Sequence, residues 1–365
     1  MAQRRIRAVF MRGGTSRALF FHEQDVPPAG DARDRMLLAA LGSPDPYGRQ
    51  LDGLGGGISS LSKACIIGPP THAEADVDYT FAQVHVGQPV VDYSGNCGNC
   101  ASAVGPFAID ERLVPPTGAD TVVRIHNTNT KKLIVAHVPV AGGEAAVAGD
   151  FELPGVPGRG ARIALDFLDP GGAGSGRLLP TGRARDLVEG LPASLVDATN
   201  PVAFVRAVDL GLTGTESPQA IDADRGLGAR LEAIRRGAAA RMGIPGSAAT
   251  PKIALVAPAT AFTALDGRGY GLEQMDLVAR VVSMGNCHRA FALTAAMCLA
   301  VAARVDGTVV HECATRRAGD VRLGHPSGIL PIAAAVTIRD GEPWAERVTV
   351  YRTARRLMEG YVRVP

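Results

Sequence analysis

Lysine is the charged residue type that this chain of 365 residues contains least. Of its 38 basic residues 34 are arginine, and the four lysines are Lys63, Lys131, Lys132 and Lys252. An amine can lose its proton when it is buried, whereas a guanidinium cannot. Each of the four lysines is therefore a candidate for a task that arginine cannot perform.

The chain also lacks a large net charge, a long apolar run and a secretory signal. Its net charge of +2 argues against a nucleic-acid or membrane-surface binder, both of which need a concentrated basic face. The longest apolar stretch, residues 291–303, is too short to cross a bilayer. Residues 1–10 are basic but have no apolar core. We expect a cytoplasmic protein with reduced thiols and a small-molecule partner, with a homodimer as the candidate assembly.

The six cysteines form no zinc-binding pattern. Cys97 and Cys100 have C-x-x-C spacing, which is compatible with a redox dithiol or with half of a metal site. No second pair completes a metal site, so no metal is expected.

Apolar alternation predicts many strands and few helices. The predicted strands are residues 77–86, 121–126, 133–140, 161–167, 253–256 and 333–338. Amphipathic surface helices are predicted at residues 31–41, 227–242 and 272–282. Residues 101–109 and 290–303 are apolar on all sides, and a helix without a polar face belongs in the interior of a domain.

Both apolar helices follow the tripeptide Gly-Asn-Cys, at residues 95–97 and 285–287. The match can arise by chance, but the chain length also suggests two domains. We favour two similar halves, each wrapping strands around one buried helix, with the two Cys-bearing helix N-termini facing each other across a cleft. The predicted domains are residues 1–185 and 186–345, with residues 346–365 packing back on the first domain.

Cys97 is the first candidate for chemistry. Asn96 is a good N-cap residue type, and a thiol at a helix N-terminus has a lowered pKa that suits proton transfer near neutral pH. The competing interpretation is a small buried cysteine, the usual state of free cysteines. For Cys100 a packing role is favoured over that of a resolving thiol.

Lys63 is the second candidate. It follows the Gly- and Ser-rich residues 53–62, whose backbone and hydroxyl groups can bind an anion, and precedes an apolar strand. A lysine amine held away from water can serve as a base. Alternatively, Lys63 stays charged and binds the anion. Lys252 is interpreted as structural, and the pair Lys131 and Lys132 as a solvated turn.

Small, donor-rich loops supply candidates for binding an anionic substrate. One such loop is Arg-Gly-Gly-Thr-Ser at residues 12–16, and another is Gly-His-Pro-Ser-Gly at residues 324–328. Further candidates lie around the two Gly-Asn-Cys tripeptides. The substrate-binding candidates are Arg12, Thr15, Ser16, Asn96, Gly98, Asn99, Met284, Gly285, His288, Ser327 and Gly328. His126 is interpreted as structural.

These motifs together resemble the PrpF-type isomerases. The resemblance rests on residues 11–16, 42–48, 53–63, 96–99, 179–182, 251–254, 324–328 and 352–360, in order along nearly the whole chain. It implies an α+β, diaminopimelate-epimerase-like fold, in which two similar domains each wrap a β-sheet around a central apolar helix. It also places the family's catalytic lysine and cysteine on Lys63 and Cys97, and its carboxylate-binding loops on Ser16, Asn99 and residues 324–328.

The resemblance implies a cofactor-independent isomerase of a small unsaturated di- or tricarboxylic acid. Family activities include 2-methylaconitate cis-trans isomerase, methylitaconate and aconitate isomerases, and 4-oxalomesaconate tautomerase. The chain departs from the family pattern at Arg17, often lysine, at Cys100, commonly aliphatic, and at Cys287, which is not a general feature. Because epimerases of the same fold use a facing cysteine pair, one alternative is an epimerase or racemase with Cys97 and Cys287 as opposed acid and base. Another is a non-enzymatic accessory protein of the methylcitrate pathway.

Overall fold

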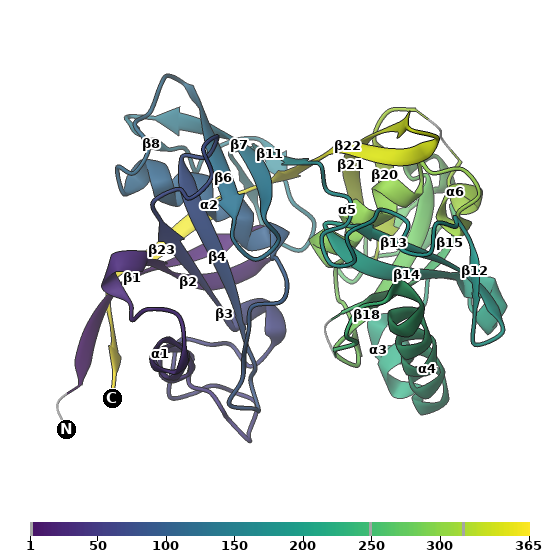
Figure 1. Ribbon diagram of the computed structural model, residues 1–365, viewed down its shortest axis with the longest axis horizontal. Helices are drawn as coiled ribbons and strands as arrows, with labels where there is room; N and C mark the ends of the chain where they lie inside the picture. Colours follow the sequence, from purple (N-terminus) through teal and green to yellow (C-terminus); the bar gives the residue numbers. More distant parts are fainter. Residues whose placement is uncertain (1–2, 248–249, 316–317) are drawn as a thin grey trace. The chain divides into compact units, whose positions relative to one another are not determined.

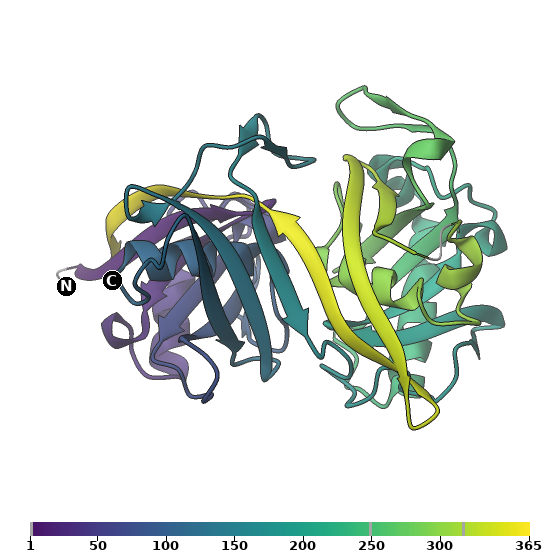
Figure 2. The ribbon, with the colours of Figure 1, turned by 90° about the horizontal axis from the view of Figure 1, so that it is seen from above.

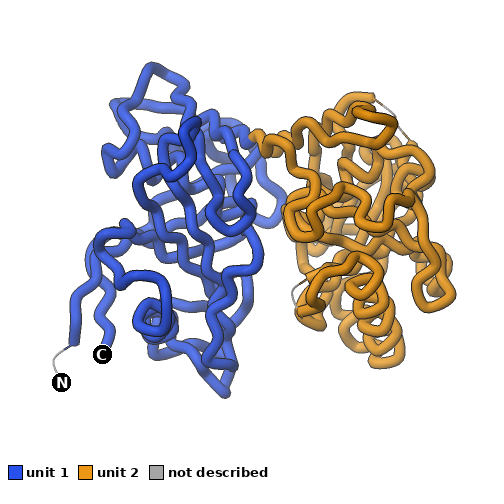
Figure 3. The backbone as a smooth tube through the Cα atoms, viewed as in Figure 1, with its two compact units in different colours: residues 1–165, 351–365 blue, residues 166–350 orange. Residues whose placement is uncertain are grey.

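The computed structural model describes residues 3–247, 250–315 and 318–365 and forms two compact units (Figure 3). Unit 1 runs to Leu165 and is completed by Tyr351–Pro365, and unit 2 is Asp166–Val350. The sequence analysis set the corresponding limits at residues 185 and 345. Among the described residues, no helix is both long and apolar enough to cross a membrane.

Unit 1 is a mixed sheet that surrounds one buried helix (Figure 1). In order across the sheet, its main strands are β23 (Ala354–Val364), β1 (Arg4–Gly13), β2 (Ser16–His22), β3 (Lys63–Gly68), β4 (Val77–Val84), β6 (Asp120–Asn127) and β7 (Lys132–Ala141). The shorter strands are β5 (Val91–Asp92), β8 (Glu144–Ala145), β9 (Phe151–Glu152), β10 (Arg159–Gly160) and β11 (Ile163–Leu168). The antiparallel pairing of β1 with β23 brings the two ends of the chain side by side (Figure 1).

The central helix of unit 1 is α2 (Gly98–Asp110), and every residue from Gly98 to Ile109 is buried. It contacts strands from β23 at one end of the sheet to β7 at the other. Small side chains such as Ala101, Ser102 and Ala103 let the strands approach the helix closely, which confirms the predicted interior helix. The surface helix α1 (Asp31–Leu41) also lies where the sequence predicts it.

Unit 2 repeats this plan around α5 (Leu293–Ala302), all of whose residues are buried. Its strands are β12 (Asp186–Val188), β13 (Leu191–Ala198), β14 (Asn200–Arg206), β15 (Lys252–Pro258), β16 (Phe262–Thr263), β17 (Gly269–Tyr270), β18 (Leu277–Ser283), β19 (Asn286–Cys287), β20 (Val321–His325), β21 (Gly328–Arg339) and β22 (Glu342–Arg352). Its other helices are α3 (Pro218–Ala223), α4 (Arg225–Met242) and α6 (Val309–Cys313). Figure 2 shows β21 and β22 as two long neighbouring strands, which pair antiparallel.

The two units share one strand topology. Successive strands β1, β2, β3, β4, β6 and β7 pair antiparallel, parallel, antiparallel, parallel and antiparallel. The strands β13, β14, β15, β18, β20 and β21 follow the same sequence of pairings. In this correspondence β3 matches β15, so Lys63 and Lys252 are the first residues of equivalent strands. The predicted similarity of the two halves is confirmed.

Two predicted helices differ from the structure. The helix predicted at residues 272–282 is wrong, because a short 3₁₀ turn at Leu272–Gln274 precedes the central strand β18. Its run Leu277-Val278-Ala279-Arg280-Val281 is buried without a break, which suits a strand covered on both faces. The second apolar helix begins at Leu293 rather than at residue 290.

The C-terminal end of α2 is attached to the sheet by Glu111. Its carboxylate accepts hydrogen bonds from Arg7 at 2.7 Å, from His22 at 2.8 Å and from Arg356 at 2.9 Å. These partners lie on β1, β2 and β23, so one carboxylate connects the central helix to three adjacent strands.

We expect Glu111→Gln to lower the free energy of unfolding at neutral pH by roughly 2 kcal/mol. Burial acts to raise the pKa of Glu111, but the hydrogen bonds from His22 and Arg356 outweigh it and the net pKa is lowered. A lowered pKa in the folded state stabilises the protein above the ordinary glutamate pKa, and this stabilisation is lost as the pH falls through the folded-state value. Urea unfolding at pH 7 and at about pH 3 measures the change in the free energy of unfolding. The control is Glu359→Gln, because Glu359 is an exposed partner of Arg356. An equal loss for Glu111→Gln at both pH values would contradict this assignment.

Candidate active site

Cys97 lies at the start of the central helix of unit 1. It is the N-cap residue of α2, and its Sγ accepts a hydrogen bond from the backbone N–H of Cys100 at 3.4 Å. The cap is therefore the thiol itself, whereas the sequence favoured Asn96. The Asn96 amide instead accepts a hydrogen bond from Asn127 at 3.4 Å.

The environment of Cys97 holds its thiol in the neutral form. The hydrogen bond to the Cys100 thiol and burial both raise the pKa of Cys97 well above the usual value, and the positive charge of Lys63 only partly opposes them. The expected lowering of this pKa by the helix N-terminus is therefore wrong, because the neighbouring thiol and the loss of water have the larger effect. A neutral thiol at this place is equipped to donate a proton.

Lys63 is buried at the first position of β3, with 7% of its surface exposed. Its Nζ donates a hydrogen bond to Oε1 of Gln83, the residue opposite it on β4, and lies 5.0 Å from the centre of the Phe81 ring. Gln83 is itself held by hydrogen bonds to the carbonyl groups of Ser59 and Ser62, at 3.1 and 2.9 Å. Lys63 is thus held in position by its neighbours, and its charge acts on the Cys97 thiol.

The Gly- and Ser-rich loop before Lys63 is organised by Gln50, which the sequence analysis did not single out. The Gln50 side chain donates to the Ser43 and Ser62 hydroxyls at 2.8 and 2.7 Å and accepts from the Gly57 N–H at 2.9 Å. Part of the donor set predicted to bind an anion is therefore used to fold the loop.

The β1–β2 hairpin packs against the first turn of α2. Asn99 donates a hydrogen bond to Oγ1 of Thr15 at 3.1 Å, so these two predicted binding residues are together. Gly14 has a positive φ of 52°, and a Cβ there would lie 2.2 Å from the Asn99 amide oxygen, so only glycine fits. Arg12 donates to the carbonyl groups of Gly14 and Thr353 at 3.0 and 2.9 Å. Ser16 is buried in β2 beside this turn.

Arg352 also belongs to this site, although it is not among the site residues predicted from the sequence. It is 3% exposed, donates from Nε to the Asn99 amide oxygen at 3.0 Å, and interacts electrostatically with Cys97. Burial lowers the pKa of Arg352 to about 9. It lies far along the chain from Cys97, and no local pattern in the sequence brings the two together.

The candidates of unit 2 occupy a hairpin and a neighbouring turn. Met284 and Gly285, with φ of 54° and 79°, form the tight turn between β18 and β19. A second turn lies between β20 and β21, where Gly328 is the first residue of β21. Ser327 donates to the carbonyl group of Arg289 at 2.7 Å, which holds this turn next to the segment that follows His288.

Cys287 does not lie at a helix N-terminus, contrary to the sequence-based expectation. It pairs with Val282 in the β18–β19 hairpin, and α5 begins six residues further on, at Leu293. Its N–H donates to Asp222 at 2.7 Å, and its side chain belongs to the hydrophobic core of unit 2. Burial raises the pKa of Cys287 to about 12. The two Gly-Asn-Cys tripeptides therefore have different local structures.

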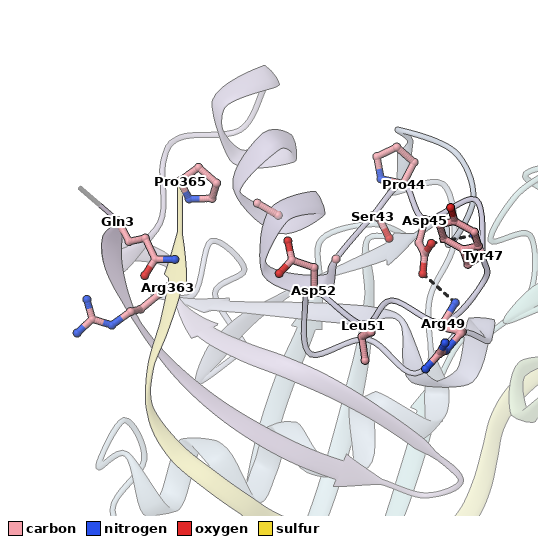
Figure 4. Close-up of a pocket in the computed structure, with 12 residues that line it drawn as sticks. Gln3, Ser43, Pro44, Asp45, Tyr47, Arg49, Leu51, Asp52, Arg363 and Pro365 are labelled. Carbon is pink, nitrogen blue, oxygen red and sulfur yellow. Dashed lines mark hydrogen bonds between the residues drawn. The ribbon is translucent and has the colours of Figure 1, made fainter. Parts of the chain in front are cut away.

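A surface pocket of about 530 Å³ lies elsewhere in unit 1, next to the paired chain ends (Figure 4). Its lining includes Asp45, Tyr47 and Asp52 of the loop after α1, and Arg363 of β23. None of the predicted catalytic or binding residues lines it. Within the described residues, no cluster of three or more His, Cys, Asp or Glu side chains has a metal-binding arrangement.

The chain matches known proteins over its whole length. Residues 3–365 match the family described as PrpF protein. The 3-methylitaconate isomerase of Eubacterium barkeri is 44% identical over 378 aligned residues, which cover 99% of this chain and 98% of that protein. The 2-methyl-aconitate isomerase of Shewanella oneidensis is 41% identical over 388 aligned residues, which cover 100% and 98%.

Solved structures show the same fold. The structure of methylitaconate-delta-isomerase aligns with a TM-score of 0.83 at 42% identity and covers 100% of this chain and 96% of that one. A hydroxyproline epimerase from Agrobacterium vitis aligns with a TM-score of 0.57 at 13% identity, covering 99% and 93%, which shows a likeness of fold alone. The predicted α+β, diaminopimelate-epimerase-like fold is confirmed.

Proposed function

This chain belongs to the PrpF family and is an isomerase, and from that premise we propose that it rearranges a small unsaturated di- or tricarboxylic acid by moving an allylic proton. The named relatives act on 3-methylitaconate and 2-methyl-aconitate. The proposed substrate class covers these acids together with aconitate and oxalomesaconate.

The observation that carries the proposal is the electrostatic interaction of Lys63 with Cys97. Lys63 at the start of β3 and Cys97 at the start of α2 are 34 positions apart in the chain, and the charge of Lys63 acts on the Cys97 thiol. Their side chains are the two proton-transfer groups that an allylic isomerisation needs.

In the proposed mechanism, Lys63 is the base and Cys97 the acid. A carboxylate conjugated through the double bond acidifies the allylic C–H, and the Lys63 amine takes that proton to leave a dienolate. The Cys97 thiol then donates its proton to the other end of the allyl unit, or to the same carbon after rotation. Proton transfer from the resulting ammonium to the thiolate restores both groups. The reaction moves protons and no electrons, so the chemistry requires no redox group.

The first turn of α2 supports stabilisation of the dienolate. The positive end of the helix dipole favours a negatively charged group bound at this turn. Thr15, Gly98 and Asn99 surround this point and are proposed to orient the substrate. In unit 2, Met284, Gly285, His288, Ser327 and Gly328 stay candidates for substrate contacts.

The proposed function is tested by incubating the protein with 2-methylaconitate, aconitate, methylitaconate and oxalomesaconate and identifying the products by NMR. We expect at least one acid to be converted to an isomer of the same mass. Conversion of none of the four, by folded protein, would contradict the proposed substrate class.

We expect Cys287→Ala to retain turnover close to that of the unchanged protein. Its side chain belongs to the hydrophobic core of unit 2, and burial raises its pKa to about 12. Steady-state kinetics with the active acid measures the effect. A loss comparable to that of Cys97→Ala would instead support the two-cysteine epimerase or racemase.

A further inference from the structure

Arg352 is a buried cation with an unused hydrogen-bonding edge. Its Nε donates to Asn99 and its Nη1 donates to the carbonyl group of Tyr351 at 2.7 Å. In the part of the chain that the structure describes, Nη2 makes no hydrogen bond. Asn99 is fixed in turn by its hydrogen bond to Thr15, so the orientation of the guanidinium is set from two sides.

No protein carboxylate compensates this charge. Among the residues that the structure describes, Arg352 has no Asp or Glu oxygen within ion-pair distance. Arg352 acts electrostatically on Cys97, and the positive end of the α2 dipole points to the same place. A buried charge without a counter-ion is costly, so this arrangement favours a bound anion.

We propose that Arg352 binds a carboxylate of the substrate and holds it beside Cys97. The planar guanidinium offers donors in a geometry that matches a carboxylate, and Asn99 acts as the positioning residue that orients it. This assignment rests on the proposed function, because it takes the substrate to be a polycarboxylic acid. It adds a binding residue from the C-terminal segment to the groups around α2.

The test is the binding of tricarballylate, a saturated tricarboxylate that has no allylic proton to transfer, measured by titration calorimetry on the full chain. We expect Arg352→Met to raise the dissociation constant at least about 30-fold. Arg355→Met is the matched control, because it removes the same charge from an exposed position of β23. We expect the control to bind nearly as the unchanged protein does.

Thermal melting separates a binding role from a structural one. Because Arg352 lacks a counter-ion, Arg352→Met without ligand is expected to melt within about 3 °C of the unchanged protein and to lose the stabilisation by tricarballylate. If Arg352→Met does not fold, Arg352→Lys replaces it in the test; it keeps the charge without the planar fork, and we expect about tenfold weaker binding.

Two results would overturn the assignment. The first is that Arg352→Met, or Arg352→Lys where it is used, binds tricarballylate with the same affinity as Arg355→Met. The second is that the unchanged protein does not bind tricarballylate at millimolar concentration. Turnover assays on the same samples report separately on the proposed function. If the protein binds tricarballylate through Arg352 but converts none of the four acids, the result contradicts the proposed isomerase mechanism and leaves the anion site supported.

Discussion

Lys63→Met is expected to lower kcat by about 10³-fold while the protein stays folded. A positioned general base contributes roughly 10²- to 10⁴-fold to a proton-transfer reaction, and methionine cannot accept the proton. Methionine has an unbranched chain that can fill the space of the lysine stem over the Phe81 ring, so the start of β3 is expected to keep its packing. Steady-state kinetics with the active acid and thermal melting of the same sample measure the two effects.

Two further variants show whether the base or merely the charge is needed. Lys63→Arg keeps a positive charge but cannot lose its proton, and we expect it to be nearly as inactive as Lys63→Met. Lys252→Met changes the equivalent first residue of β15 in unit 2, and we expect it to leave turnover nearly unchanged. Near-normal turnover by Lys63→Arg would show that Lys63 acts through its charge and that the base lies elsewhere.

Cys97→Ala is expected to lower the rate of isomerisation by roughly 10²- to 10⁴-fold, because the proton donor is lost. The change removes one sulfur from the N-cap and leaves the buried body of α2 in place. Cys313→Ala, which removes a buried thiol from unit 2, is the control and is expected to retain turnover. Equal turnover by Cys97→Ala and Cys313→Ala would remove Cys97 from the mechanism.

The raised pKa of Cys97 also predicts the pH dependence of this step. The thiol donates a proton only while it is protonated, so the alkaline fall in kcat that belongs to Cys97 is expected above the ordinary thiol pKa. A fall in kcat near neutral pH that disappears in Cys97→Ala would contradict the neutral-thiol assignment.

The sequence predicted the parts of the fold that local patterns determine. The α1 limits follow from amphipathic spacing, and the interior position of α2 follows from its lack of a polar face. The helix predicted at residues 272–282 was wrong because Glu273, Asp276 and Arg280 recur at helical spacing and indicate a solvated helix face, whereas Arg280 is buried within the strand β18. The shared Gly-Asn-Cys tripeptide correctly indicated two similar halves, although it caps a helix in unit 1 and closes a hairpin in unit 2.

The candidate site was predictable only where single residue types are informative. Lysine scarcity and the Gly-rich loop singled out Lys63, and the structure adds its contacts with Gln83 and Phe81. The direction of the Cys97 pKa shift depends on the Cys100 thiol and on burial, which sequence position does not give. Arg352 is the last residue of β22, near the far end of the chain, so only the tertiary structure places it beside Asn99.

Hydrogen–deuterium exchange in D₂O, followed by NMR of the active acid, tests the central claim most directly. We expect the unchanged protein to incorporate deuterium as it forms the isomer. Cys97→Ala is predicted to exchange the allylic hydrogen of the substrate without forming the isomer, since Lys63 still removes and returns a proton. Lys63→Met is predicted to do neither. Allylic exchange catalysed by Lys63→Met would contradict the assignment of Lys63 as the base.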